Sequence, residues 1–171
     1  MNDTPMAAKS LGEGPSWDRE KGELRILGHR NAAVDARALC EYLDSLVGAQ
    51  VGEVIMKNLE TRLGKEDGFW LQKENSQLGP NQLIHIVTEW DRMAGIGATQ
   101  ATLVENGPTS ILLEVANPIM KVSQGAARAF LFGWWAGVLT SILGRDFDYT
   151  NVVYDPAKDV MKCEFVPRST D

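Results

Sequence analysis

The feature that most constrains the fold is an apolar run at residues 129–143, which is bounded by Arg128 and Arg145. The run is long enough for about four turns of helix, because a helix turns once every 3.6 residues. It falls short of the roughly 17–25 residues that a membrane-spanning helix needs. We therefore expect a buried core helix and no membrane span.

Two glycines lie within this run. Gly133 and Gly137 are four residues apart, so a helix places them on one face. Each costs about 1 kcal/mol of helix propensity relative to alanine, and a close neighbour must offset that cost. The neighbour is either the packed backbone of another element, including a second copy of the chain, or a ligand lying beside Trp134 and Trp135. The sequence leaves both alternatives open.

Helical spacing also appears in the first half of the chain. Apolar residues recur at three- and four-residue steps over residues 31–48, 51–64 and 80–90. Asn31 is suited to cap the first of these segments. We expect three helices there, with residues 69–71 as a further helical piece.

Alternating patterns replace the helical spacing after residue 97. Residues 99–105 and 110–116 predict one hairpin, and residues 147–154 and 160–166 predict a second. A weaker alternation at residues 23–27 predicts a short strand or an extended arm. The order of elements favours an α+β fold, in which an antiparallel sheet of four to five strands packs against N-terminal helices and the long glycine-containing helix.

The chain of 171 residues has the size of one domain. Residues 1–16 have no periodic apolar pattern and are expected to form a flexible leader, which leaves residues 17–171 as a single domain. The net charge of −6 and the lack of a long Lys/Arg run argue against nucleic acid as a partner. Two cysteines and the lack of a secretory signal favour a cytoplasmic location.

Candidate binding residues are a histidine and a set of aromatic side chains. His85 stands one turn before Glu89, and such a pair can bind a ligand hydroxyl or act as acid and base. A histidine hydrogen-bonded within the fold explains the same pattern. The aromatic side chains form either pocket walls or ordinary core, because an apolar ligand site is a part of the core left unfilled. They are Phe69, Trp70, Trp90, Phe130, Phe132, Trp134 and Trp135.

The sequence lacks the motifs of common enzyme classes. It has no Ser–His–Asp order, nucleophile elbow or phosphate-binding loop. Gly95-Ile96-Gly97 lacks the third glycine of a dinucleotide fingerprint and precedes a strand instead of a helix. We therefore lean towards a protein that is not an enzyme, with no catalytic residue and no cofactor.

Several short patterns together resemble a known family. The glycine pair is followed by Thr140-Ser141 and Gly144-Arg145, is preceded by the turn at residues 95–97, and is followed near the C-terminus by Cys163-x-Phe165. This order resembles the 4-vinyl reductase domain family. The family includes aromatic-sensing domains of bacterial transcription activators, hydrocarbon-binding proteins and proteins linked to bacteriochlorophyll vinyl reduction, and it shares its fold with TRAPP tethering-complex subunits. The resemblance implies a dimeric ligand-binding module with a mostly apolar pocket.

The resemblance also implies a zinc site, which sensor members of the family build from cysteines and an acidic residue. Only Cys163 matches that set here. The other positions carry Arg128, Asn151 or Val152, and Asp155. One thiolate, one carboxylate and an arginine make a poor zinc site, so we expect no metal. Asp155 is then interpreted as a turn former and Cys163 as a small buried hydrophobe.

Two functional hypotheses follow, from different classes. The first is a homodimeric sensor or carrier that encloses a small apolar or aromatic molecule. The second is a structural or adaptor dimer similar to TRAPP subunits, with a filled interior and a possible protein partner; an accessory role in tetrapyrrole vinyl reduction rests on the family name alone. The residues predicted to bind the ligand are Trp70, His85, Trp90, Phe130, Gly133, Trp134 and Gly137.

Overall fold

The computed structural model describes residues 16–18, 23–26, 29–31, 35–104, 110–121 and 124–168. The chain divides into two compact units, Met1–Val34 and Asp35–Asp171. In the first unit, β1 (Ser16–Asp18), β2 (Glu23–Ile26) and β3 (His29–Asn31) form an antiparallel sheet in that order. The predicted strand at residues 23–27 is thus confirmed as β2. The predicted leader lies outside the described residues except for Ser16, and the single-domain boundary stays a prediction.

The second unit begins with a helix that starts later than the sequence pattern predicts. Asn31 pairs with Leu24 in the first sheet, so the prediction that it caps a helix is wrong. Helix α1 (Ala36–Val47) is capped by Asp35, whose carboxylate accepts a hydrogen bond from the Ala38 amide at 3.0 Å. An aspartate at this position satisfies a backbone donor that the helix itself leaves unpaired.

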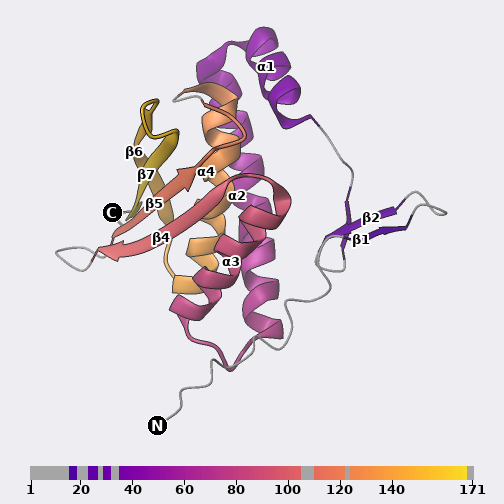
Figure 1. Ribbon diagram of the computed structural model, residues 1–171, viewed down its shortest axis with the longest axis vertical. Helices are drawn as coiled ribbons and strands as arrows, with labels where there is room; N and C mark the ends of the chain where they lie inside the picture. The colour runs from indigo at the N-terminus through magenta and orange to yellow at the C-terminus, as the bar shows by residue number, and fades with distance from the viewer. Residues whose placement is uncertain are drawn as a thin grey trace. The chain divides into compact units, whose positions relative to one another are not determined.

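Helix α2 (Ala49–Glu74) is a single helix of 26 residues. The predicted end at Gly64 is wrong, and the piece predicted at residues 69–71 belongs to the same helix. Gly64 and Gly68 continue the helix because they lie against helix α4 (Gly125–Leu143), and this contact replaces the stabilisation that alanine would give. Figure 1 shows α2 and α4 side by side.

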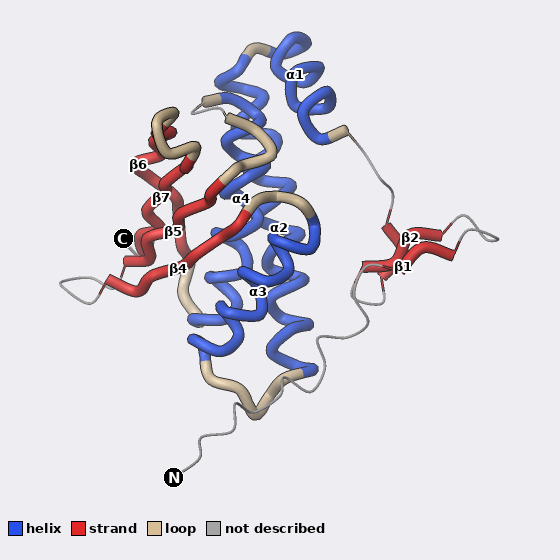
Figure 2. Tube along the Cα trace, in the orientation of Figure 1, coloured by secondary structure: helices blue, strands red, loops and turns tan. Residues whose placement is uncertain are grey.

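The remaining elements form the predicted hairpins and a third helix. Helix α3 (Pro80–Ala94) leads into β4 (Ala98–Val104), which pairs with β5 (Ser110–Ala116). After α4, β6 (Phe147–Asp155) pairs with β7 (Val160–Pro167), and β7 also pairs with β5. The four strands make one antiparallel sheet in the order β4-β5-β7-β6 (Figure 2). The α+β class is confirmed.

Helix α4 forms the centre of the core. Its Phe132 ring packs on the sheet, with centroids 6.1 Å from Tyr149 and 6.4 Å from Phe165. Trp135 and Val138 are also buried. By length and composition α4 is apolar enough to cross a membrane, yet most of it is buried inside the structure, which accounts for its apolar character.

Candidate functional site

A groove runs between α3 and the edge strand β4. It consists of two adjoining hollows of about 280 and 370 Å³. They share four lining residues and are therefore continuous. These are Asn81, Ile84, Ala101 and Thr102. Pockets for small molecules measure roughly 300–1,000 Å³, so the groove has the size of a small-ligand site.

One end of the groove has an apolar floor, with Asn81 and Thr102 at its rim. Its floor consists of Ile84 from α3 and Ile111 from β5, which are buried, together with the half-buried Ala101 and Leu103 of β4. Strand alternation turns Ala101 and Leu103 to the side of the sheet that faces the helices. This end therefore offers apolar surface to a compact ring.

The other end of the groove is polar. His85 and Arg92 of α3 are exposed there, and the Arg92 guanidinium donates to both carboxylate oxygens of Glu89 at 3.1 and 3.2 Å. The predicted pair of His85 and Glu89 thus lines one groove, although Glu89 is held by Arg92. Beside them lie Thr88 and Thr99, which are 7% and 2% exposed.

A buried carboxylate lies directly beneath this polar end. Asp91 is 4% exposed, and its Oδ2 accepts hydrogen bonds from the Thr99 hydroxyl at 2.9 Å and from the Trp135 indole at 2.6 Å. Burial raises the pKa of Asp91 to about 6, against the lowering effect of these two hydrogen bonds. The three side chains connect α3, β4 and α4 immediately below the groove.

The glycine pair of α4 faces helix α2. A Cβ atom added to Gly137 would lie 2.7 Å from the Lys65 amide nitrogen, and one added to Gly133 would lie 3.0 Å from the Glu60 Cβ. Real Cβ atoms do not approach backbone atoms as closely as at Gly137, and the contact at Gly133 is a tight one with a side chain. Of the two alternatives that the sequence leaves open, the element that approaches these glycines is a neighbouring helix backbone.

The predicted aromatic residues lie on other parts of the helices. The Trp134 indole donates to Asp67 of α2 at 2.7 Å, and Phe130 is half-buried one turn earlier. Trp70 and Trp90 form a tilted ring pair with centroids 6.3 Å apart. The Trp90 Nε1 is buried and donates to no atom of the described residues. Of the seven predicted site residues, only His85 lines the α3–β4 groove; ligand contact by the others stays a prediction.

The sequence pattern missed the buried polar residues of the groove. Thr88, Asp91 and Thr99 carry no motif, because their significance comes from the crossing of α3 and β4. The one available signal is Asp91 itself, an acidic residue one position after Trp90 and at helical spacing from Ile84 and Val87. A charged residue in such a place is buried only with partners.

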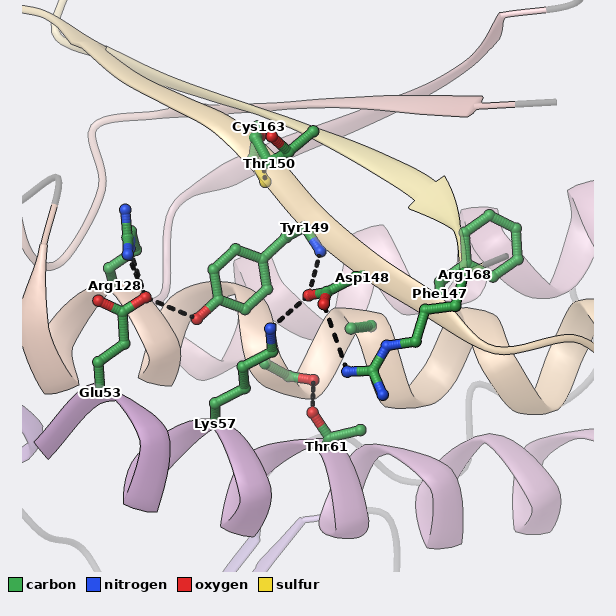
Figure 3. Close-up of polar contacts among 12 residues, drawn as sticks. Glu53, Lys57, Thr61, Arg128, Phe147, Asp148, Tyr149, Thr150, Cys163 and Arg168 are labelled. Carbon is green, nitrogen blue, oxygen red and sulfur yellow. Dashed lines mark hydrogen bonds and ion pairs between the residues drawn. The ribbon is translucent and has the colours of Figure 1, made fainter. Parts of the chain in front are cut away.

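A second polar cluster joins α2, α4 and β6 (Figure 3). Glu53 forms an ion pair with Arg128 and accepts a hydrogen bond from the Tyr149 hydroxyl at 3.3 Å. The Lys57 ammonium lies 4.7 Å from the centre of the Tyr149 ring and 2.5 Å from the Asp148 carboxylate. These contacts fix the sheet to the helices.

Comparisons with known proteins show which solved structures share this fold. No protein-family model matches the sequence, and no curated protein matches it. The chain is similar to the crystal structure of the phenol-responsive sensory domain of the transcription activator PoxR with phenol. The alignment covers 90% of this chain and 84% of the PoxR domain, with a TM-score of 0.69 and 13% sequence identity. The chain is also similar to a vinyl-4-reductase family protein from Methanocaldococcus jannaschii. That alignment covers 81% of this chain and 85% of the other protein, with a TM-score of 0.52 and 18% sequence identity. The chain has a 4-vinyl-reductase-like fold. The resemblance expected from the sequence is confirmed at the level of the fold.

The absence of the zinc site stays a prediction, and the residues at the positions that the resemblance assigns to it have other partners here. Arg128 stands where a cysteine is expected, and its guanidinium is paired with Glu53. Asp155 accepts hydrogen bonds from the Ala157 and Lys158 amides at 3.0 and 3.3 Å, as a turn former does. Cys163 is fully buried, and burial raises the pKa of its thiol. Among the described residues, no group of three or more His, Cys, Asp and Glu is arranged to hold a metal.

Proposed function

We propose that this protein is a sensor or carrier that binds a small aromatic molecule in the α3–β4 groove. The observation that carries the proposal is the combination of an apolar floor and buried hydroxyl groups in one continuous groove. The fold likeness to a phenol-responsive sensory domain supports the same ligand class.

Burial of the ring supplies most of the affinity in this proposal. Removing apolar surface from water contributes about 25 cal/mol per Å², and the costs of ordering the ligand oppose that gain. The half-buried Ala101 and Leu103 provide most of the apolar contact, while the polar end of the groove orients the molecule. We place this activity in the cytoplasm, where the buried free thiols of Cys40 and Cys163 would stay reduced.

The test is calorimetric titration of the full chain with phenol, toluene and aniline, together with thermal shift. Ala101→Leu fills the apolar floor and is expected to abolish binding, because a larger side chain occupies the space of the ring. Ala98→Leu is the matched control, since Ala98 is exposed at the start of the same strand. The proposal fails if no compound binds, or if Ala101→Leu binds as tightly as the unchanged protein.

A second candidate function, dimerisation as a structural or adaptor protein, is favoured by an apolar stripe on α2. Val51, Ile55, Leu59 and Leu63 follow one another at four-residue steps and are 42–51% exposed. Tyr42 and Leu46 of the preceding helix are more than 60% exposed. An exposed apolar patch of this kind marks an interaction surface. A second copy of the chain, joined through the same stripe, would cover it symmetrically.

Native mass spectrometry and sedimentation of the full chain test this interface. The double change Ile55→Glu and Leu59→Glu is expected to give a folded monomer, because it places charges at the centre of the stripe. Lys73→Glu, an exposed change near the end of α2, is expected to leave the dimer intact. A monomeric unchanged protein would exclude the interface, whatever the outcome of the ligand titrations.

A further inference from the structure

A second groove, the α2–β7 groove, lies between α2 and the residue that follows β7, and its lining is rich in basic side chains. It has a volume of about 440 Å³ and shares no lining residue with the α3–β4 groove. Its lining includes the carboxylate of Glu66 and four cations, although the whole chain has a net charge of −6. The cations are Lys57, Arg62, Lys65 and Arg168. Cations gathered in a hollow of an acidic protein indicate a site for an anion.

Two of these cations converge on one carboxylate (Figure 3). The Lys57 ammonium lies 2.5 Å from Oδ1 of Asp148, and Nη2 of Arg168 lies 3.3 Å from Oδ2 of the same side chain. One carboxylate carries one negative charge, so Asp148 leaves one positive charge of the pair without compensation. A guanidinium has five N–H groups, and the bond from Arg168 to Asp148 uses one of them.

The other two cations each have a carboxylate of their own. Lys65 pairs with Asp146 at 2.8 Å, and Arg62 pairs with Glu66 at 3.3 Å. The four side chains of these pairs are 44–81% exposed, so water screens both pairs and each contributes little stability. In these ion pairs the four cations of the groove face three carboxylates, which leaves a positive charge in excess.

Lys57 and Arg168 are held in place in the absence of any ligand. The Lys57 ammonium lies 4.7 Å from the centre of the Tyr149 ring, and the lysine side chain is only 26% exposed. The backbone amide of Arg168 donates to the Asp146 carbonyl oxygen at 2.9 Å, which fixes the chain directly after β7. A side chain that is already ordered loses less entropy when it binds a ligand. These two cations are therefore the anchor of the groove.

We propose that the α2–β7 groove binds the oxyanion group of a small acidic molecule, a carboxylate or a phosphate, with Lys57 and Arg168 as its anchor. A guanidinium offers an oxyanion a planar set of N–H donors, and an ammonium adds a compact positive charge. The hollow has the size of a small-molecule site, and the chain has no long Lys/Arg run that could follow a nucleic acid backbone. This inference goes beyond the proposed function, because it concerns a different groove and requires no aromatic ring.

Inorganic phosphate, succinate and uncharged glycerol are the probes that test the groove. Each is added at constant ionic strength to the isotopically labelled full chain, and the backbone amide signals are followed by NMR. We expect at least one of the two anions to give saturable shifts at Asn58, Lys65 and Arg168, and glycerol to give none. Tighter binding of phosphate would assign a phosphate ester to the groove, and tighter binding of succinate would assign a carboxylate. The proposal fails if neither anion gives saturable shifts at these residues.

Three substitutions test the anchor. Arg168→Gln is expected to weaken anion binding about tenfold, which is the effect of one charge-assisted hydrogen bond. Asp148→Asn removes the carboxylate that competes for both cations and is expected to tighten binding, which a merely structural role of the anchor would not produce. Lys158→Gln removes an exposed cation of the β6–β7 turn and is the matched control. Equal affinities of Arg168→Gln and the unchanged protein, or equal losses in Arg168→Gln and Lys158→Gln, would overturn the proposal.

Discussion

Gly64 of α2 lies against the backbone of Val138 of α4, so that a Cβ atom on Gly64 would come within 3.0 Å of the Val138 nitrogen. Alanine at this position would force the two helix backbones apart. We expect Gly64→Ala and Gly137→Ala each to lower the free energy of unfolding by about 2–3 kcal/mol, despite the better helix propensity of alanine. Chemical denaturation measures this change.

Two other glycines provide graded controls for that prediction. A Cβ on Gly133 would meet the Glu60 Cβ at 3.0 Å, which is a side-chain contact, and one on Gly79 would meet only the Gln82 side chain at 3.9 Å. The loss of stability is therefore expected to be smaller for Gly133→Ala and smallest for Gly79→Ala. A Gly64→Ala variant as stable as the unchanged protein would contradict the close helix contact.

The ion pair of Glu53 and Arg128 is expected to depend on both partners. Their side chains are 16% and 32% exposed, and Arg128→Met would leave the Glu53 carboxylate without its cation in a largely buried place. We expect a loss of about 2–3 kcal/mol for this single change and a smaller loss for the double change with Glu53→Met, since no charge then remains unpaired. Unfolding of all variants in urea gives the comparison.

The control for this prediction is the pair of Arg62 and Glu66, whose side chains are 81% and 64% exposed. Arg62→Met is expected to change stability by less than about 0.5 kcal/mol, because water screens an exposed pair. Additive losses in the Glu53 and Arg128 cycle would show that the pair contributes no coupling.

Two buried tryptophans are expected to differ in the cost of losing their indole N–H. The Trp135 indole donates to Asp91 at 2.6 Å, whereas the Trp90 indole donates to no atom of the described residues. Trp135→Phe removes a hydrogen bond to a carboxylate, so we expect it to cost about 1–2 kcal/mol more than Trp90→Phe. Thermal unfolding of the two variants in parallel is the measurement, and equal losses would argue against the Asp91 contact.

Stability is expected to depend on pH through Glu60. Burial, with the nearby Asp67 carboxylate, raises the pKa of Glu60 from 4.5 to about 7. The folded protein then holds this proton more tightly than the unfolded chain. The stabilisation that comes from protonated Glu60 is complete below about pH 4.5 and is lost as the pH rises to about 7.

Glu60→Gln stays neutral and is expected to remove this part of the pH dependence. Between pH 4.5 and 7 the unfolding free energy of the unchanged protein should fall relative to that of the variant by on the order of 2–3 kcal/mol. Glu66→Gln, at an exposed position of the same helix, serves as the control. Parallel curves for the unchanged protein and Glu60→Gln would refute the shift.

Much of the fold follows from local pattern. The alternation at residues 110–116 and 160–166 predicted β5 and β7 because side chains of a strand point alternately to two faces, and one face here is buried. The apolar run predicted α4 because a helix apolar on all sides belongs in a core. The start of α1 was predicted wrongly. Asn31 and Asp35 are both suitable helix caps, but Asn31 pairs with Leu24 in a strand, so Asp35 caps the helix.

The sequence by itself determined that Gly133 and Gly137 need a close neighbour, since their cost in helix propensity is a local property of the chain. Only the tertiary structure decided that the neighbour is α2, and that the groove lies elsewhere, between α3 and β4. The commitment of Thr99 to Asp91 likewise joins residues of two different elements. A hydrogen bond between elements depends on how they cross, and the pattern within each element carries no record of that crossing.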